Sequence, residues 1–195
     1  MRINHKPCIK GYTLGRPLSP LPPIPVGKNH PGAFGIDRHL HVHTGVDLYA
    51  PHGAPVAAIE TGRVIKVAWF TGPSIGLPWW QDTRAVYIEG PSGVMNYGEI
   101  QEYPNIKVGD IIYKGENFGY VIPVLKKYKG RPMSMLHFEL YDHGYVDDWG
   151  EWKIGEPKPE HLKDPTSILL SIMDSVPIAS DPYSKSSEEY KEKFL

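Results

Sequence analysis

The sequence predicts a mainly β protein, a compact antiparallel β-sheet domain with a proline-rich N-terminal arm and a short helical C-terminal segment. Three observations lead to this class. The 195 residues include 20 glycines and 20 prolines, and so many turn formers favour short strands over long helices. Short apolar runs recur roughly every ten residues, and turn sequences separate them. No long segment between these runs has the periodicity of a helix, so a parallel sheet covered by helices is not expected.

Residues 1–30 form the predicted arm. The run 18–25 reads Leu-Ser-Pro-Leu-Pro-Pro-Ile-Pro. Proline lacks the backbone donor and fixes φ, so this run can sustain neither a helix nor a central strand. We expect an extended arm packed on the domain, with a peptide ligand for a partner protein as the alternative.

Residues 30–173 form the predicted β-domain. Its strands are expected at 55–59, 62–69, 85–89, 94–97, 111–113, 118–122 and 135–141. The Gly-Pro-Ser-Gly sequence at 90–93 predicts a hairpin. Two connections, 71–83 and 123–134, are long enough to be candidates for a functional role.

The C-terminal part divides into two pieces. Residues 165–173 are expected to form one or two helical turns with an apolar face. Residues 174–195 are rich in Ser, Lys and Glu, which indicates a polar tail that is mobile or bound to a partner.

The composition excludes several classes of protein. A net charge of -1 gives no basic excess for binding nucleic acid or an anionic membrane surface, and the basic run at 126–131 is interpreted as a solvated loop. No stretch is long and apolar enough for a membrane span, and the N-terminus lacks the apolar run of a secretory signal. The location is therefore open, with a virion component or non-Sec delivery to the cell wall as the expectation. Cys8 is the sole cysteine, which excludes an internal disulfide and a cysteine-rich zinc module.

A candidate zinc site combines two distant motifs. His43 and Asp47 lie four residues apart, and His137 stands within a predicted strand far downstream. Two imidazoles and a carboxylate make a three-ligand set that leaves the fourth position of zinc for water or substrate. Gly45 allows the backbone to approach closely, and Glu139 shares the strand face of His137, where it could orient the ligand as an acceptor in the outer shell.

These motifs resemble those of the lysostaphin-type (LytM-like) zinc endopeptidases. The resemblance is carried by 43–58 with 62–64, by the paired-glycine segment 108–120, by the closing motif 136–139 and by Asp164-Pro165. It covers roughly residues 30 to 170, in the family's order and spacing. It implies a lysostaphin-like fold of the duplicated hybrid motif type. It also implies an enzyme that cleaves peptide bonds of bacterial peptidoglycan. It also implies that His43, Asp47 and His137 bind Zn²⁺.

Two positions depart from the family pattern. The closing motif of the family begins with a histidine where this chain has Met135, and its central motif has a histidine where this chain has Glu99. Loss of a general base and of an oxyanion donor would together cost ~10⁴–10⁷ in rate if the effects were independent. Glu99 could take over as the catalytic base, whereas Met135 can supply neither a proton nor a charge. His41 and His143 could be recruited, although nothing in the sequence places them at the site.

Two functional interpretations follow. One is a metalloendopeptidase-like domain directed at peptidoglycan peptides, with weak or lost activity. The alternative is a non-catalytic zinc-stabilised binding or structural module, for example a bacteriophage tail component with virion or cell-wall assembly partners. Tyr97, Trp79 and Trp80 are predicted to line the substrate groove, with an apolar plug beneath the 71–83 loop as the alternative for the tryptophan pair.

Overall fold

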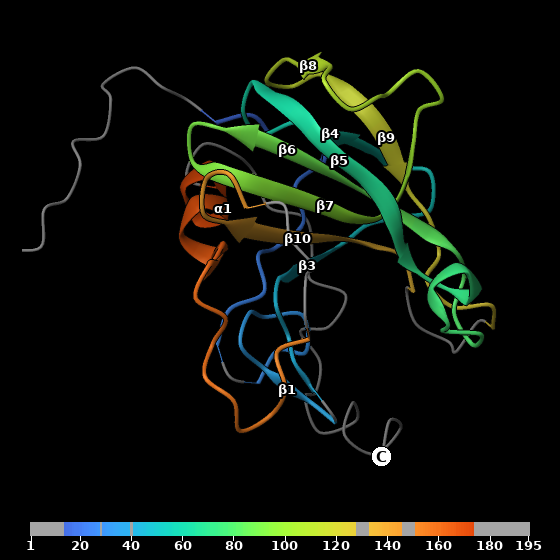
Figure 1. Cartoon of the computed structure of the whole chain (residues 1–195), viewed down its shortest axis with the longest axis vertical. Helices are drawn as coiled ribbons and strands as arrows, with labels where there is room; N and C mark the ends of the chain where they lie inside the picture. The colour runs from blue at the N-terminus through green and yellow to red at the C-terminus, as the bar shows by residue number, and fades with distance from the viewer. Residues whose placement is uncertain (1–13, 28, 40, 128–132, 146–150, 174–195) are drawn as a thin grey trace, which may run out of the picture.

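The computed structural model describes residues 14–27, 29–39, 41–127, 133–145 and 151–173. In that part of the chain nine strands form one antiparallel sheet, and two more form a small hairpin below it in Figure 1. The prediction of a mainly β antiparallel domain is confirmed. The strands are β1 (Asp37–Arg38), β2 (His41–Val42), β3 (Val46–Tyr49), β4 (Pro55–Ala57), β5 (Gly62–Thr71), β6 (Thr83–Gly90), β7 (Gly93–Glu102), β8 (Ile111–Ile112), β9 (Asn117–Val121), β10 (Met135–Tyr141) and β11 (Leu162–Lys163).

The main path of the sheet runs β11-β10-β7-β6-β5-β8. β6 and β7 form the hairpin predicted at 90–93, and Gly90 pairs with Gly93 at its turn. β3 also pairs with β10, and β9 pairs with both β4 and β7. The register places His137 of β10 opposite Asp47 of β3 and opposite Gly98 of β7. Strands from the two ends of the domain therefore meet at one position.

The alternation of β10 separates the core from the site. Leu136, Phe138 and Leu140 belong to the main hydrophobic core. His137 and Glu139 lie between them in sequence, and side chains of a strand alternate between its two faces, so both point to the opposite face. A strand that is buried throughout thus presents polar groups on one side only.

The N-terminal arm is part of the same core. Leu18, Leu21 and Ile24 are buried in the main hydrophobic cluster. The Ala57 N–H donates to the carbonyl of Pro17 at 3.0 Å, which fixes the arm beside β4. Over the described residues 14–27 the chain packs on the domain, and residues 1–13 of the predicted arm lie outside the described residues.

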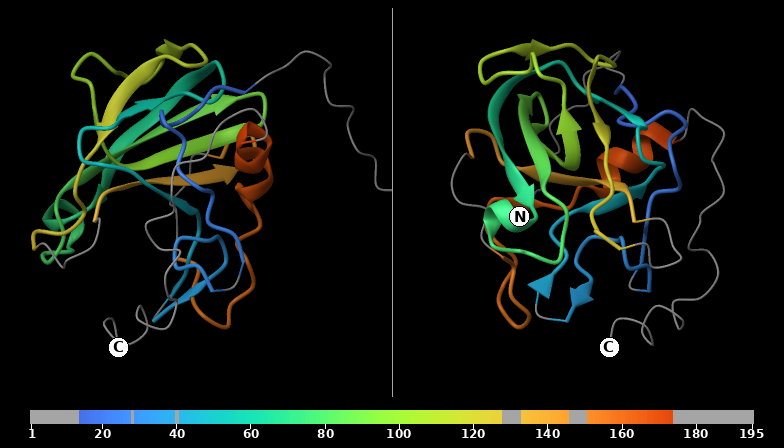
Figure 2. Two further views of the ribbon diagram at one scale, coloured as in Figure 1. Left: turned by 180° about the vertical axis from the view of Figure 1, so that it is seen from behind. Right: turned by 90° about the vertical axis from the view of Figure 1, so that its right-hand side faces the viewer.

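The helix predicted over 165–173 is present as α1 (Thr166–Met173). It lies at one end of β7 and β10 in Figures 1 and 2, and it inserts Leu169 and Ile172 into the main core. The predicted tail 174–195 lies outside the described residues. Among the helices described, none is long and apolar enough to cross a membrane.

The two long connections touch each other. The first contains the 3-10 helix η1 (Pro73–Ile75), which lies beyond one end of the sheet in Figure 1. Trp80 forms an isolated β-bridge with Leu125, and the Gln81 N–H donates to the carbonyl of Val124 at 2.7 Å. The contact brings the 71–83 connection beside the start of β10, next to the candidate site.

Candidate metal centre

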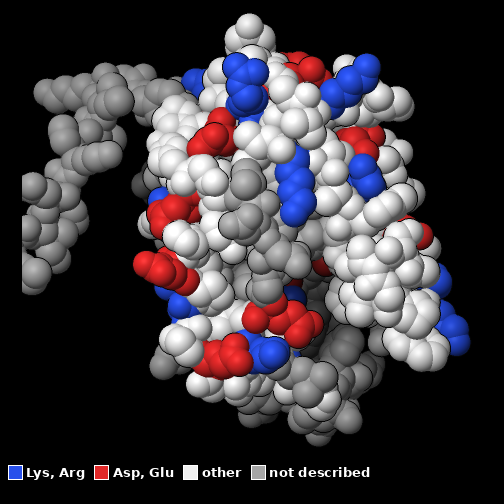
Figure 3. Space-filling view, in the orientation of Figure 1, with Lys and Arg blue, Asp and Glu red and all other residues white. Residues whose placement is uncertain are grey.

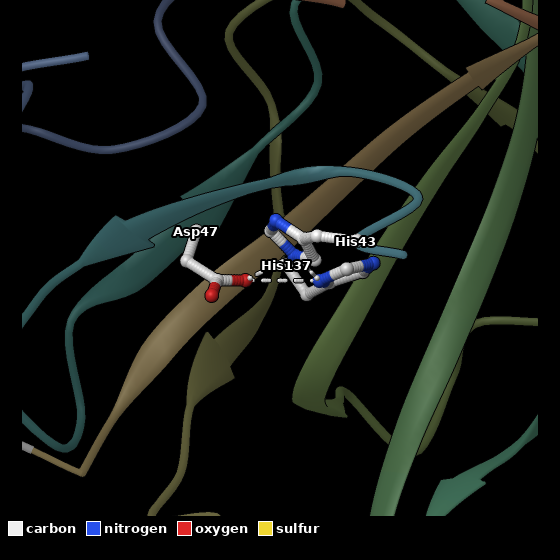
Figure 4. A group of neighbouring side chains, drawn as sticks. All are labelled: His43, Asp47 and His137. Carbon is white, nitrogen blue, oxygen red and sulfur yellow. Dashed lines mark hydrogen bonds and ion pairs between the residues drawn. The ribbon is translucent and has the colours of Figure 1, made fainter. Parts of the chain in front are cut away.

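The two motifs that predict a zinc site converge in the structure. Asp47 comes from β3, His137 from β10, and His43 from the segment before β3, and the three side chains point toward one another (Figure 4). His43 Nε2 lies 3.1 Å from Asp47 Oδ1 and 3.2 Å from His137 Nδ1. His137 Nδ1 lies 2.9 Å from Asp47 Oδ1. All three residues are buried.

This donor set fits a tetrahedral zinc ion. Ligand bonds of about 2.0–2.1 Å in a tetrahedron require ligand atoms about 3.3 Å apart, close to the distances above. The ring nitrogens that face away from the centre also form hydrogen bonds that leave the facing nitrogens with a lone pair for a metal. His43 Nδ1 lies 2.7 Å from the Ala33 carbonyl, and His137 Nε2 lies 3.0 Å from Glu139 Oε1. Because each outer nitrogen donates its proton to an oxygen, the inner nitrogen of each neutral ring is free to bind a cation.

Glu139 is the acceptor that orients His137. It also receives hydrogen bonds from Thr44 Oγ1, from Asn96 Nδ2 at 2.5 Å, and from the Tyr141 hydroxyl at 2.9 Å. Burial by itself would raise its pKa, but the charge of His137 and these donors hold the pKa of Glu139 at about 2. These contacts fix the carboxylate in its ionised form beside His137, and a role for Glu139 in orienting a metal ligand stays a prediction.

Asp47 has a second partner that sequence analysis missed. Arg38 Nη2 forms an ion pair with Asp47 Oδ2, the oxygen that faces away from the two histidines, and donates to the Pro31 carbonyl at 2.6 Å. Burial opposes ionisation of Asp47, but the Arg38 charge, followed by that of His43, holds its pKa well below the usual range. A lone arginine before the first motif carried no sequence signal.

Without a metal ion, the two carboxylates beside His137 favour its protonated form. Burial lowers the pKa of His137, but the Glu139 charge and the hydrogen bonds to Asp47 and Glu139 raise it to about 10. Burial lowers the pKa of His43. At neutral pH the His137 imidazolium therefore bridges two carboxylates, and a metal ion that binds Nδ1 must displace that proton.

Gly45 explains how the first motif approaches β10. A Cβ at this position would lie 2.6 Å from the Phe138 carbonyl oxygen and 2.8 Å from His137 Nε2. Real side chains do not make contacts this short, so the close approach expected of Gly45 requires glycine. Glycine at this position thus allows the segment that carries His43 and Asp47 to lie directly against His137.

Glu99 lies in a β-bulge beside the site. Arg84 pairs with Ile100 and Val86 with Tyr97, so β7 has one more residue than β6 in this stretch. Glu99 occupies the extra position with φ 62, in the left-handed region. A side chain held there costs of order 1 kcal/mol or more, and bulges commonly re-aim side chains near functional sites.

The Glu99 carboxyl differs sharply from that of Glu139. It is buried, and within the described residues its Oε2 has no hydrogen-bond partner. Burial, followed by the charge of Asp47, raises the pKa of Glu99 to about 8. The group is close enough to the candidate metal ligands to respond to their charges.

Met135 closes another side of the site with apolar atoms. It points to the same face of β10 as His137 and pairs with Tyr49 of β3. Tyr49, Val124 and Met135 form a small buried cluster, and Trp80 packs against it. This position therefore carries no polar group.

The predicted groove residues have three different surroundings. The prediction for Tyr97 is wrong, because this residue is fully buried in the core, with its ring edge-on to Phe118 at 5.0 Å and Phe138 at 5.1 Å. Trp80 is partly buried and packs against Tyr49, Val124 and Met135. Trp79 is 81% exposed.

Trp79 belongs to an apolar surface around η1. Trp69, Ile75 and Leu77 are also exposed there. In Figure 3 the lower right part of the face is mostly uncharged, with Lys or Arg atoms along its right edge. Whether this surface contacts substrate stays a prediction.

Phe70 is an aromatic residue that contacts one of the candidate ligands. Its ring centroid lies 5.3 Å from that of His137. A Cβ at Gly98 would lie 2.6 Å from the Phe70 ring, so glycine makes room for it. Sequence analysis missed Phe70 because its run reads as an ordinary strand. His143, considered as a recruit, instead lies 3.2 Å from the Pro91 carbonyl at the hairpin turn.

The chain is thus an antiparallel β-domain with a candidate metallohydrolase centre. The centre consists of two histidines and an aspartate, with a glutamate hydrogen-bonded to one of the histidines. The sequence profile described as peptidase family M23 matches residues 41–148, more than half of the chain. The chain belongs to peptidase family M23. This match confirms the family that the motifs resemble.

Solved structures with similar folds include CbpA from L. salivarius REN, at 17% identity and TM-score 0.51 over 83% of this chain and 98% of that chain. The catalytic domain of lysostaphin from Staphylococcus simulans is similar at 20% identity and TM-score 0.46, over 82% and 90%. A zinc-containing peptidase from Vibrio cholerae is similar at 22% identity and TM-score 0.44, but the match covers only 36% of that chain and 66% of this one. No curated protein matches the sequence.

Proposed function

We propose that this chain is a zinc-binding domain directed at peptide bonds of bacterial peptidoglycan, in which hydrolysis is weak or lost. The observation that carries the proposal is a contrast within one site. The ligand set His43, Asp47 and His137 has tetrahedral spacing and an orienting carboxylate, yet Met135 and Glu99 stand at the two family histidine positions. Such a site would keep its metal and lose part of its chemistry.

The metal would be held by His43 Nε2, Asp47 Oδ1 and His137 Nδ1. When bound, zinc would polarise a peptide carbonyl and make water a better nucleophile at neutral pH. Glu139 would hold the His137 ring in the tautomer that binds the cation. Glu99 would have to accept the proton from the attacking water, and a nearby dication would favour its ionised form.

Loss of polar groups on the other side of the site limits the rate. Met135 packs with Tyr49, Val124 and Trp80, so it offers no donor to a developing oxyanion. One missing donor of this kind costs ~10²–10³-fold in rate. A glutamate in a strained bulge in place of a histidine would lower the rate further.

A second function is favoured by the same apolar cluster. A site in which the donor position is filled by packed side chains suits a non-catalytic module that keeps zinc for stability. A virion component, such as part of a bacteriophage tail, is one setting proposed for such a module.

The test is release of soluble fragments from labelled peptidoglycan, with and without a chelator. Wild type should give slow, chelator-sensitive release or none, and Glu99→Gln should abolish any that is present. The double variant Met135→His with Glu99→His should raise the rate, because it rebuilds both histidines and leaves the ligands untouched. His137→Ala is the control for background release.

Three outcomes separate the proposals. Wild-type release as fast as that of relatives with both histidines would contradict reduced activity. A metal-loaded wild type and double variant that are both inactive would favour the non-catalytic module. Release that the chelator and His137→Ala leave unchanged would show that the metal is not involved.

A further inference from the structure

Among the described residues, Arg38 is the lysine or arginine that forms an ion pair with a candidate metal ligand, and the proposed function leaves it without a role. It ends β1 and lies on the small β1–β2 hairpin below the main sheet in Figure 1. The segment that leads to it is fixed to the site, because the Asp47 N–H donates to the Gly32 carbonyl at 2.9 Å and the His43 N–H to the Ile36 carbonyl at 2.8 Å. Backbone hydrogen bonds from both ligand residues therefore hold the segment of Arg38 beside the centre.

One nitrogen of the Arg38 guanidinium forms hydrogen bonds within the protein, and the other two can donate to a ligand. Nη2 contacts both Asp47 Oδ2 and the Pro31 carbonyl. Within the described part of the chain, neither Nε nor Nη1 of Arg38 has a hydrogen-bond acceptor. The side chain is 32% exposed, whereas that of Asp47 is 4% exposed. A guanidinium offers five N–H donors in a planar fork, so donors remain that solvent or a ligand can reach.

Arg38 is also close enough to Tyr49 and Glu99 for their charges to act on it. Burial opposes its charge, but Asp47, and to a smaller extent Tyr49 and Glu99, raise the pKa of Arg38 above its usual value. Tyr49 is the β-pair partner of Met135. The fixed positive charge thus acts on Tyr49, the residue that pairs with Met135.

We propose that Arg38 makes this centre an oxyanion-binding site, in which a carboxylate or a tetrahedral oxyanion that ligates the metal is also held by the free edge of the guanidinium. The inference rests on the proposed metal site. It deepens the proposed function, because it names the charge that replaces the donor lost at Met135 and the class of ligand that the centre takes.

The chemistry favours an oxyanion over a neutral ligand. Arginine binds carboxylates and phosphates through paired N–H donors, and such charge-assisted bonds are about twice as strong as neutral ones. A divalent cation and Arg38 together carry more positive charge than Asp47 and Glu139 carry negative charge. While Glu99 is protonated, a ligand anion would balance the remainder.

A purely positioning role for Arg38 makes a different prediction. If the guanidinium served only to orient Asp47, its loss would weaken every ligand of the metal alike. If it binds the oxyanion, its loss would weaken anions and spare a neutral ligand. The ratio of the two affinities separates these roles and does not require hydrolysis.

The experiment uses the full chain loaded with Co²⁺ in place of zinc, whose visible spectrum reports changes in ligation. Acetate and inorganic phosphate are the planar and tetrahedral anionic probes, and imidazole is the neutral probe. In Arg38→Gln the dissociation constant of at least one anion should rise about tenfold or more, while that of imidazole stays within about twofold. An effect on acetate alone indicates a substrate carboxylate, and an effect on phosphate alone indicates the tetrahedral oxyanion of hydrolysis.

Arg63→Gln is the matched control, because Arg63 also donates to a backbone carbonyl, that of Gly109 at 2.8 Å, but is exposed on β5 away from the ligands. It should leave all three affinities unchanged. If Arg38→Gln no longer holds Co²⁺, Arg38→Lys takes its place, since it keeps the charge beside Asp47 and lacks the fork. An unchanged anion-to-imidazole ratio in the Arg38 variant that holds metal would overturn the proposal. Wild type that binds no Co²⁺ would instead contradict the metal site and with it the proposed function.

Discussion

Two buried glutamates beside the candidate metal centre have opposite surroundings. Glu139 accepts four hydrogen bonds, and its pKa is held at about 2. Glu99 has a buried oxygen without a partner in the described residues, and its pKa is raised to about 8. The first carboxylate stabilises the ligand set. The second is costly to ionise, and a protein keeps such a group where its reactivity or its response to a cation is used.

Glu99 should therefore make the stability of the metal-free protein depend on pH. The unfolded chain loses this proton near pH 4.5 and the folded chain near pH 8, so stability is highest below the lower value and falls as pH rises toward the higher one. Glu99→Gln removes this loss. In chelator-treated protein the melting temperature of Glu99→Gln should exceed that of wild type by an amount that grows from pH 5 to pH 8. Glu160→Gln, at an exposed glutamate, controls for the loss of one negative charge. A difference that stays constant across this range would contradict the buried, partnerless carboxyl.

Some elements could be predicted from the sequence and others could not. The hairpin at 90–93 and the strand of His137 were predictable because turn residues and alternation act locally. The bulge at Glu99 was not, because it arises from the register between β6 and β7. The same holds for Arg38 and Phe70, which reach the site through tertiary packing. Tyr97 was misplaced because a buried tyrosine and a groove tyrosine look alike in a strand sequence.

The arm is an element whose contribution to stability can be measured. Leu18 is 1% exposed and packs in the main core, although it stands far from any strand in sequence. Leu18→Ala should lower the free energy of unfolding by about 2–5 kcal/mol, as for other large-to-small core substitutions. Val26→Ala, at an arm residue that is 53% exposed, should change it by less than about 0.5 kcal/mol. Denaturant unfolding of both variants checks this, and equal effects would show that the arm is not anchored through Leu18.

Across the molecule, the centre joins distant parts of the chain. Asp47 and His137 are 90 residues apart, and His43 and His137 are 94 apart. β10 pairs with β3 along one edge and with β7 along the other, and His137 takes part in both pairings. A metal at this point would therefore connect the early strand β3 to β10, the last long strand, which also pairs with β7. A ligand that binds only the folded state stabilises it by mass action.

Removal of metal should therefore lower the melting temperature. At a free metal concentration 100 times the dissociation constant, the stabilisation is about 2.7 kcal/mol, which corresponds to roughly 5–10 °C for a chain of this size. His137→Ala should melt at the same temperature with and without chelator, because it lacks a ligand. Should wild type melt unchanged after its metal has been stripped, the centre would have no structural role.

The metal content of the protein purified without chelator tests the central claim most directly. Elemental analysis should find about one equivalent of zinc per chain in wild type, as expected for one three-ligand site. His137→Ala should lose most of it, while His143→Ala, at an exposed histidine bonded to the hairpin turn, should retain it. Zinc content in His137→Ala equal to that of wild type would contradict the assignment of His43, Asp47 and His137 as the metal centre.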